Sequence, residues 1–294
     1  MDRDIHLVNV FTAEGRGGNL APIVLDATGL KDSEMRDVAR RYERESVFVF
    51  PAEEGSGADF SLRFFVPGHE MEMCGHATVG TGWIMHRLGL VTETETEIKF
   101  MTKSGLVSTR RDRVANANTT GEMVSVSVSQ PKGTLEDVQD ERLIAQILSV
   151  LRVDSSHLGP WAIQNACTSR VKTVIPLKSA ATLNSLDPDF EKVKDLCDQL
   201  GSTGLYPYAV VQHGNGLGPT KIEARQFPRA SGYPEDAATG IAAAALSRAL
   251  ATNGLARSGE SVVVYQGRAM GHLSQINVLV EDTGCWIGGT CAMA

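Results

Sequence analysis

The chain contains few cysteines and no long hydrophobic segment. Five cysteines in 294 residues, an odd number at irregular spacings, are not typical of a disulfide framework, so we expect free thiols. No run of about eighteen apolar residues occurs, and the amino-terminal residues lack a basic region followed by an apolar one. We therefore expect a cytoplasmic protein with no membrane partner.

Positive charge is also scarce. The chain has 28 Lys and Arg against 35 Asp and Glu, a formal net charge of −7. Nucleic acids favour proteins with clustered Lys and Arg, so we expect no nucleic-acid partner and small solutes as ligands. The length and the 42% hydrophobic residues are sufficient for the cores of two modest domains.

What the sequence does contain is a weak internal duplication. LRFFVP at 62–67 leads into CGHATVGTGWIMHRLGL, and ARQFPR at 224–229 leads into DAATGIAAAALSRALATNGL. Each copy has Arg-x-Phe, an acidic loop, and then a glycine that opens a helix of small residues. Fourteen residues after that glycine each copy has another, at a position typical of a helix C-terminal cap. We expect two similar α/β halves.

Most of the remaining segments are expected to be strands. Short runs rich in β-branched or alternating residues predict strands at 4–11, 46–51, 61–66, 124–129, 208–213 and 261–267. Apolar residues at three- and four-residue spacing predict helices over 31–43 and 136–151, on the outside of the halves. The polar stretch 112–122 is expected to connect the domains. The glycine-rich stretch 214–221 favours a hairpin loop over a phosphate site.

The segment MEMCGHATVG, residues 71–80, permits three interpretations. The first is a metal site, with possible ligands His69, Glu70, Glu72, Cys74 and His76. Alternate residues of a strand share a face, but the spacing lacks the paired ligands of typical zinc sites. The second is a buried cysteine and a hydrogen-bonded histidine without function. The third is a helix starting at Gly75 whose N–H groups, with those at Gly240, would seat an anion or enolate across a domain cleft.

Six segments along the chain carry a family resemblance. They are GGNLAPIVL, RESVFVF, LRFFVPGHEMEMCGHATVGTG, EDAATGIAAAAL, QGRAMGHLSQINV and WIGGTC. Their order and spacing resemble the PhzF-like family of phenazine-biosynthesis isomerases, over essentially the whole chain. The resemblance implies an α/β (α+β) fold of the diaminopimelate epimerase type, in which each of two similar lobes wraps a curved, mostly antiparallel sheet around a central helix. We place the lobes at 1–118 plus 280–294 and at 119–279.

The same resemblance implies roles for single residues. It places the general acid/base on Glu45, where burial beside an apolar strand would let a carboxylic acid exchange protons near neutrality; a surface glutamate is the alternative. It places substrate binding and polarisation on His76 and Asp236, and backbone donors on Gly75 and Gly240. Asp236 could also be a helix N-cap. The predicted substrate-binding residues further include Asn19, Ala77 and Thr239.

Two positions depart from the family pattern. Ile241 follows Gly240 where phenazine-type members usually have serine, so we do not expect a dihydroxylated phenazine precursor as substrate. Cys74 occupies the position of one of the two catalytic thiols in diaminopimelate epimerase and proline racemase relatives, and a helix N-terminus would favour its thiolate. Because the second thiol position is Ala237, a two-cysteine racemase is not expected. A mixed pair of Cys74 with Glu45 or Asp236 stays open.

These observations together predict an isomerase of secondary metabolism that needs no cofactor and no metal. It would move a proton by an allylic 1,3-shift on a small carboxylate-bearing substrate, with Glu45 removing the proton and returning it on the same face. The resemblance also implies a homodimer. The alternatives are an amino-acid epimerase that uses Cys74 as one base, and a catalytically silent binding or scaffold protein.

Overall fold

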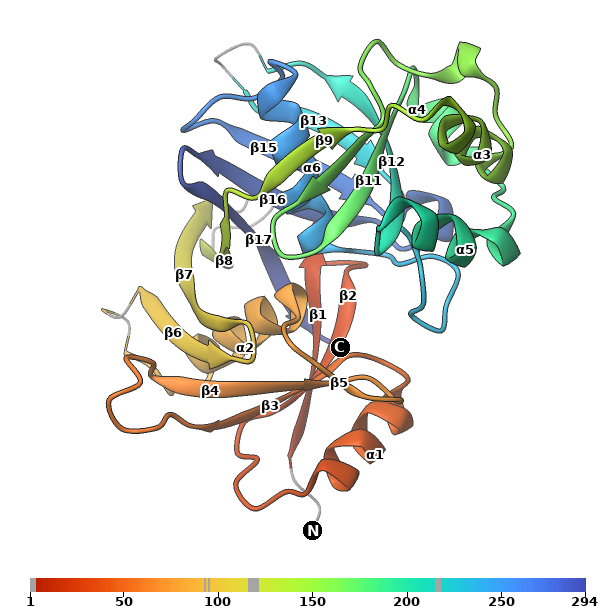
Figure 1. Cartoon of the computed structure of the whole chain (residues 1–294). Coiled ribbons are helices and arrows are strands. Elements are labelled where there is room, and N and C mark those ends of the chain that lie inside the picture. Colours follow the sequence, from red (N-terminus) through yellow and green to blue (C-terminus); the bar gives the residue numbers. More distant parts are fainter. Residues whose placement is uncertain (1–3, 93, 95, 116–121, 215–217) are drawn as a thin grey trace. The chain divides into compact units, whose positions relative to one another are not determined.

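The computed structural model describes residues 4–92, 94, 96–115, 122–214 and 218–294, without the side chains of 112–115, 122 and 123. The chain divides into two compact units, a first unit of 1–129 with 288–294 and a second unit of 130–287 (Figure 1). These divisions fall inside β8 (Glu122–Pro131) and β17 (Gly284–Met293), whereas the sequence analysis placed them at 118/119 and 279/280. No helix in the described ranges is long and apolar enough to cross a membrane.

The prediction that 112–122 forms a connection is wrong at both ends of this stretch. Residues 112–115 end β7 (Gly105–Ala115) and residue 122 begins β8, because the two strands pair antiparallel along their length. Only 116–121 can form the connection, and they lie outside the described residues. The stretch 214–221 follows β12 (Gly204–Gln212) and reaches into its antiparallel partner β13 (Thr220–Ala224), as a hairpin requires; its residues 215–217 also lie outside the described ones.

The sheet of the first unit closes on itself. Its other strands are β1 (Ile5–Thr12), β2 (Asn19–Val24), β3 (Ser46–Pro51), β4 (Phe60–Phe65), β5 (Glu70–Met71) and β6 (Glu97–Thr102). From β1 the pairing runs through β2, β3, β4, β6, β7 and β8 to β17, which pairs with β1. The pairs β1–β2, β3–β4, β6–β7, β7–β8 and β1–β17 are antiparallel, whereas β2–β3 and β4–β6 are parallel. This barrel-like sheet encloses one helix.

That helix is α2 (Gly75–Arg87), and its small residues let it fit inside the sheet. Every residue from Gly75 to Met85 is buried, as expected for a helix that is surrounded on all sides. A Cβ at Gly80 would lie 2.9 Å from Cγ2 of Val10 on β1, and one at Gly82 would lie 3.1 Å from Oγ1 of Thr109 on β7. Larger side chains would therefore push the strands away from the helix.

The second unit repeats this plan. Its strands are β9 (Thr134–Asp137), β10 (Gln164–Cys167), β11 (Val171–Leu177), β12, β13, β14 (Phe227–Pro228), β15 (Ser261–Gln266) and β16 (Ser274–Glu281). They pair in the order β9, β10, β11, β12, β13, β15, β16, with β14 on the end of β12. The central helix is α6 (Gly240–Thr252), which packs against β9, β10, β11 and β16.

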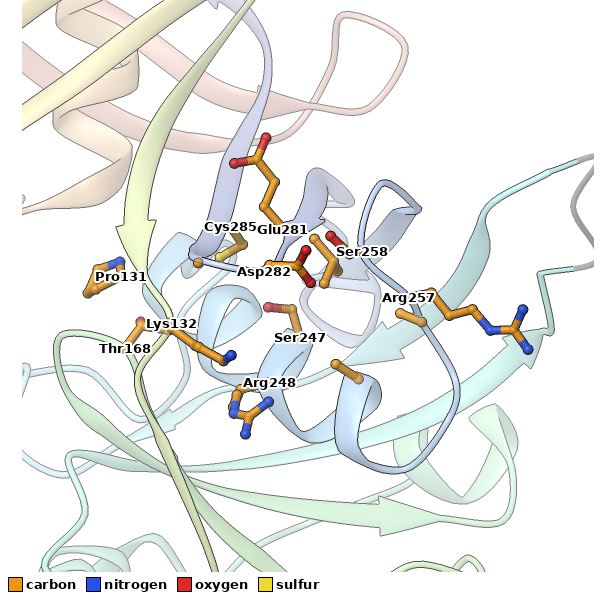
Figure 2. Close-up of a pocket in the computed structure, with 14 residues that line it drawn as sticks. Pro131, Lys132, Thr168, Ser247, Arg248, Arg257, Ser258, Glu281, Asp282 and Cys285 are labelled. Carbon is orange, nitrogen blue, oxygen red and sulfur yellow. The ribbon is translucent and has the colours of Figure 1, made fainter.

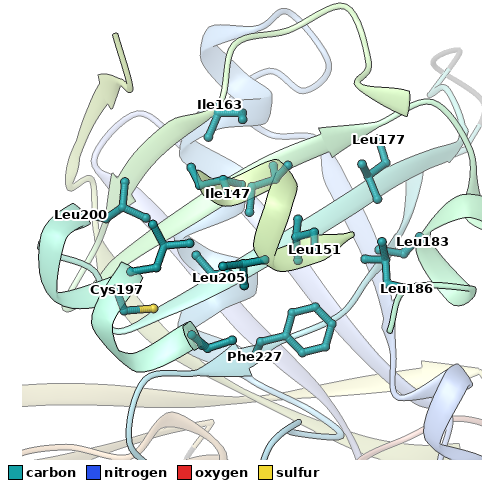
Figure 3. Close-up of a cluster of buried hydrophobic side chains, with 14 of the residues drawn as sticks. Ile147, Leu151, Ile163, Leu177, Leu183, Leu186, Cys197, Leu200, Leu205 and Phe227 are labelled. Carbon is teal, nitrogen blue, oxygen red and sulfur yellow. The ribbon is translucent and has the colours of Figure 1, made fainter. Parts of the chain in front are cut away.

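Amphipathic helices add further cores. In the first unit α1 (Asp32–Tyr42) packs its buried face against Phe48 and Phe65. In the second unit α3 (Glu141–Leu151), α4 (Ala180–Asn184) and α5 (Phe190–Leu200) share a cluster with residues of β11 and β12 (Figure 3). The predicted helices at 31–43 and 136–151 are confirmed, but the second begins later because Asp140 caps it, accepting the Arg142 N–H at 2.8 Å. Helix α5 was not predicted, although Val193, Leu196 and Leu200 lie on one face.

The two central helices match in length and in the way they end. Each has 13 residues, starts at the predicted glycine, and is followed by a left-handed glycine, Gly89 with φ of 68° and Gly254 with φ of 73°. One residue later Leu90 N–H donates to the Met85 carbonyl, and Leu255 N–H donates to the Leu250 carbonyl. The predicted strands are confirmed as well. The expected fold class, two similar lobes each with a curved sheet around a central helix, is therefore confirmed.

Candidate active site

Glu45 lies in the short segment between α1 and β3. Helix α1 ends at Tyr42, Glu43 takes the left-handed conformation with φ of 51°, and the chain then enters the buried strand that starts at Ser46. The side chain of Glu45 is partly buried, and its Oε2 atom is shielded from solvent. Its negative charge acts on the ring of His76. These two predicted site residues are therefore close enough in the first unit for their charges to interact.

His76 lies in the first turn of α2 and is almost fully buried, with 6% of its surface exposed. Burial lowers the pKa of His76, since a charged ring loses its hydration there; the Glu45 carboxylate and the nearby Leu20 backbone oppose this shift and Arg44 adds to it. The ring atom Nδ1 lies 3.2 Å from Sγ of Cys74. Neutral imidazole, with one donor and one acceptor nitrogen, is therefore the favoured state at neutral pH.

The backbone around His76 is arranged as a helix start. Cys74 is the N-cap residue, with φ of −137° and ψ of 110°, and its carbonyl accepts the N–H and the hydroxyl of Thr78 at 3.0 and 2.8 Å. The amide groups of Gly75, His76 and Ala77 precede the first intrahelical hydrogen bond, so they point along the axis as potential anion donors. No side chain larger than histidine occupies this turn. Asn19, at the start of β2, is buried next to Leu20.

In the second unit Asp236, Thr239 and Gly240 lie together at the start of α6. The Thr239 hydroxyl donates to Oδ2 of Asp236 at 2.5 Å, and the side-chain amide of Gln266 donates to the Asp236 carbonyl at 2.7 Å and to the Thr239 hydroxyl at 3.2 Å. Tyr206 donates its hydroxyl to the amide oxygen of Gln266 at 3.0 Å. Asp236 is held in place by this network. The N-cap of α6 is Thr239, so the alternative that Asp236 serves as the cap is wrong.

The metal interpretation of residues 69–76 needed a strand that continues to residue 76, and the chain does not form one. Strand β5 covers only Glu70 and Met71, and α2 already begins at Gly75. The carboxylate of Glu70 is occupied by Arg63 at 2.8 Å and by Lys103 at 2.6 Å. Across the described ranges no three His, Cys, Asp or Glu side chains are grouped to hold a metal ion. The geometry behind that interpretation is therefore wrong.

With both helix starts described, comparison with known proteins becomes informative. The model of the family described as phenazine biosynthesis-like protein matches residues 8–291. The chain belongs to this family. An uncharacterized isomerase of Deinococcus radiodurans is 33% identical over 283 residues, covering 94% of this chain and 86% of the relative. The trans-2,3-dihydro-3-hydroxyanthranilate isomerase of Pseudomonas aeruginosa is 28% identical over 281 residues, covering 95% and 90%.

A solved structure confirms the fold of this phenazine biosynthesis-like protein. The PhzF-family phenazine biosynthesis protein of Bacillus anthracis has a TM-score of 0.85 and 24% identity, covering 99% of this chain and 96% of that one. The resemblance stated from the motifs is thereby confirmed. The assignment of individual site residues stays a prediction.

Sequence reasoning missed two buried polar residues near Asp236 in this family member. Lys172 on β11 is 6% exposed, and its Nζ lies 3.5 Å from the Thr203 carbonyl oxygen. Burial lowers the pKa of Lys172 to about 8, although the negative charge of Asp236 acts to raise it. Gln226 is 1% exposed, and its backbone carbonyl accepts the Asp236 N–H at 3.1 Å. Lys172 could have been found as the single lysine inside the apolar run VKTVIPL. The sequence gives no comparable signal for Gln226 beyond its place in ARQFPR.

A cavity of about 320 Å³ in the second unit contains none of the predicted site residues (Figure 2). It lies against the C-terminal half of α6, where Ser247, Arg248 and Ala251 form part of its wall. The predicted residues lie at the opposite, N-terminal end of the same helix. The cavity is therefore separate from the candidate site within this unit.

Proposed function

We propose that the protein is a cofactor-independent isomerase that moves a proton by an allylic 1,3-shift on a small carboxylate-bearing substrate. Family membership and the isomerase names of its relatives support the reaction class. The observation that carries the residue assignment is the electrostatic interaction of Glu45 with the buried His76 at the start of a helix of small residues. A carboxyl group that can take and return a proton next to amide donors is what such a shift requires.

In the proposed reaction Glu45 removes a proton from a carbon of the substrate, and the C–H electron pair moves into an enolate. The N–H groups at Gly75 and Gly240 stabilise the negative oxygen, because preorganised donors act strongly where water is excluded. The carboxylic proton of Glu45 exchanges with solvent, and Glu45 then protonates the allylic carbon on the same face while the double bond moves. One proton leaves one carbon and one proton is added to another, so no oxidant or second substrate is consumed.

Binding and orientation fall to the remaining predicted residues. His76 donates a hydrogen bond as neutral imidazole, which suits an oxyanion without competing with Glu45 for the transferred proton. Asp236 accepts from a substrate donor group and is aligned by Thr239 and Gln266. Asn19 and Ala77 complete the wall around His76 in this proposal.

The identity of the substrate depends on the position after Gly240. The relative from Pseudomonas aeruginosa is named for its action on trans-2,3-dihydro-3-hydroxyanthranilate, but 28% identity leaves substrate choice open. Ile241 places an apolar, partly buried side chain in the first turn of α6. We propose an unsaturated or cyclic acid with less polar substitution than that compound, because an apolar wall leaves polar groups without partners.

Deuterium exchange separates the proposed isomerase from its rivals. Candidate acids are incubated with the full-length protein in deuterated water and followed by NMR. Label at one carbon together with a displaced double bond supports the isomerase. Inversion at a stereocentre without a displaced double bond supports an amino-acid epimerase, for which the position of Cys74 at the helix start is the favouring observation. An acid that binds without any exchange would identify a silent binding protein.

A further inference from the structure

Cys74 and His76 contact each other across the start of α2. The sulfur lies 3.2 Å from ring atom Nδ1, and both residues are buried, with 5% and 6% of their surfaces exposed. Cys74 has an extended backbone at the N-cap, and its side chain makes no capping hydrogen bond to the helix. The sulfur is therefore directed to the imidazole and not to the helix amides that an N-cap side chain normally binds.

The chemistry of this contact favours one arrangement of protons. A neutral imidazole has one N–H and one bare nitrogen, and the bare nitrogen is a good acceptor. A thiol donates weakly, but sulfur accepts more weakly still, so S–H donating to Nδ1 is the better of the two possible hydrogen bonds. A thiolate paired with an imidazolium would place two charges in a buried site, which is costly without further hydrogen bonds. The ring proton then resides on Nε2.

The other ring nitrogen indicates where that proton points. Nε2 is shielded from solvent and has no acceptor in good hydrogen-bond geometry among the described residues, while the Leu20 backbone also interacts with the ring. A buried N–H left without an acceptor costs about 1–3 kcal/mol, so such groups in native proteins usually have a functional reason. The Glu45 side chain acts on the same ring. In the proposed reaction this N–H is the donor that acts beside Glu45.

We propose that Cys74 is a positioning residue whose thiol donates to Nδ1 of His76, holds the ring as the Nε2–H tautomer, and directs that N–H to an oxygen atom of the substrate. The proposal rests on the function proposed above and deepens it. In this role the thiol keeps its proton through the whole reaction, unlike the base of an epimerase. It also explains how a cysteine can serve the site although Ala237 stands at the second thiol position.

The test compares Cys74→Ala and Cys74→Ser, with Cys167→Ser as a matched control in the second unit. The ring nitrogens of ¹⁵N-histidine-labelled protein report the tautomer directly, and a His76→Gln variant assigns the signal. We expect the Nε2–H tautomer in the parent, the control and Cys74→Ser, whose hydroxyl also donates. We expect a mixture or the Nδ1–H tautomer in Cys74→Ala, with kcat for exchange lowered about 10- to 100-fold, as for other residues that orient a histidine.

Each alternative gives a different result. If Cys74 is a base, Cys74→Ser loses activity as fully as Cys74→Ala while the tautomer stays unchanged. If Cys74 only fills space, neither variant alters the tautomer or kcat. Both results would overturn the proposal. The tautomer signal does not require turnover, so it remains informative if no acid is converted and the proposed function itself fails. Near-UV circular dichroism confirms that each variant is folded.

Discussion

Arg225 and Glu235 form two parallel hydrogen bonds, Nε to Oε1 at 2.8 Å and Nη2 to Oε2 at 2.7 Å. The first unit contains the same pair, Arg63 with Glu70, at 2.8 and 2.8 Å. In each unit the arginine also stacks on the phenylalanine two residues later, at 5.0 and 5.1 Å from the ring centre. The Arg-x-Phe motif and the acidic loop of the duplicated sequence therefore form the same ion pair and ring contact in both units. In the second unit it fixes the loop that ends in Asp236.

The two pairs differ in burial, which predicts different effects on stability. Arg225 and Glu235 have side chains only 7% and 9% exposed, whereas Arg63 is 31% exposed. Removing one partner of a buried pair costs about 3–5 kcal/mol, because the other charge is left without compensation. We expect Arg225→Met to lower the free energy of unfolding of the second unit by that amount. We expect Arg63→Met to cost about 1 kcal/mol.

Urea unfolding followed by hydrogen exchange, which resolves the two units, measures both losses. Arg225 also donates to the carbonyls of Leu183 and Leu186. Glu235→Gln keeps those bonds and separates their contribution from that of the ion pair. Equal losses for Arg225→Met and Arg63→Met would show that burial does not govern the strength of these pairs.

The plan of the fold could be predicted because its signals are local. Small residues from Gly75 and from Gly240, with a glycine fourteen positions later, specify buried helices of fixed length. Alternation along 261–267 specifies a strand. The start of α3 and the whole of α5 were harder to predict from the sequence. Thr134–Asp137, which precedes α3, becomes a strand only by pairing with β10, and α5 follows an irregular loop. Pairing between distant segments is not encoded in local periodicity.

The candidate site was predictable only in part, for a related reason. Glu45 has no distinctive local pattern, so its predicted role came from the family resemblance, and its electrostatic effect on His76 depends on the tertiary structure. Lys172 and Gln226 lie near Asp236 because β11 packs against α6 and because Gln226 forms an antiparallel β-bridge with Asp236. Such convergence depends on tertiary structure. The exception is Lys172, because a single lysine within an apolar strand sequence indicates a buried charged group.

Glu45→Gln tests the proposed acid/base directly. The amide has the size of the carboxylate but cannot accept a proton, so we expect exchange to fall about 10²- to 10⁴-fold while binding of the acid is nearly unchanged. Glu43→Gln is the matched control, since Glu43 is exposed and two residues away. Isothermal titration and deuterium exchange give the two quantities. Undiminished exchange in Glu45→Gln would remove Glu45 from the mechanism.

Ile241→Ser tests the proposed control of substrate polarity. A hydroxyl in the first turn of α6 would give a polar substituent of the substrate a partner and remove apolar contact area. We expect kcat/KM for hydroxylated acids to rise, and that for apolar acids to fall, each by about 10-fold or more. Ile241→Val, which keeps the apolar surface, should leave the preference unaltered. Equal changes for both classes of acid would indicate that residue 241 does not contact the substrate.

Lys172→Met tests the cost of the buried ammonium group through its dependence on pH. Burial lowers the pKa of Lys172 from 10.5 to about 8, so between these values the unfolded chain binds more protons than the folded one. The contribution of Lys172 to the free energy of unfolding therefore rises with pH over that interval. The cost of burying its ammonium group is fully present below about pH 8. We expect the stability of Lys172→Met relative to the parent to fall by about 2 kcal/mol between about pH 7 and about pH 9.5.

The comparison between variants isolates Lys172 together with two groups whose charges interact with it, Asp236 and Cys197, because the other titrating groups contribute equally to both proteins. The exposed Lys178→Met serves as the control and should show no such dependence. Activity provides a second readout, since Asp236 opposes the shift and the ammonium group therefore stabilises its carboxylate. Lys172→Met is expected to be more stable at neutral pH yet less active, because Asp236 loses the positive charge beside it. A variant that gains stability equally at both pH values would show that Lys172 is not desolvated.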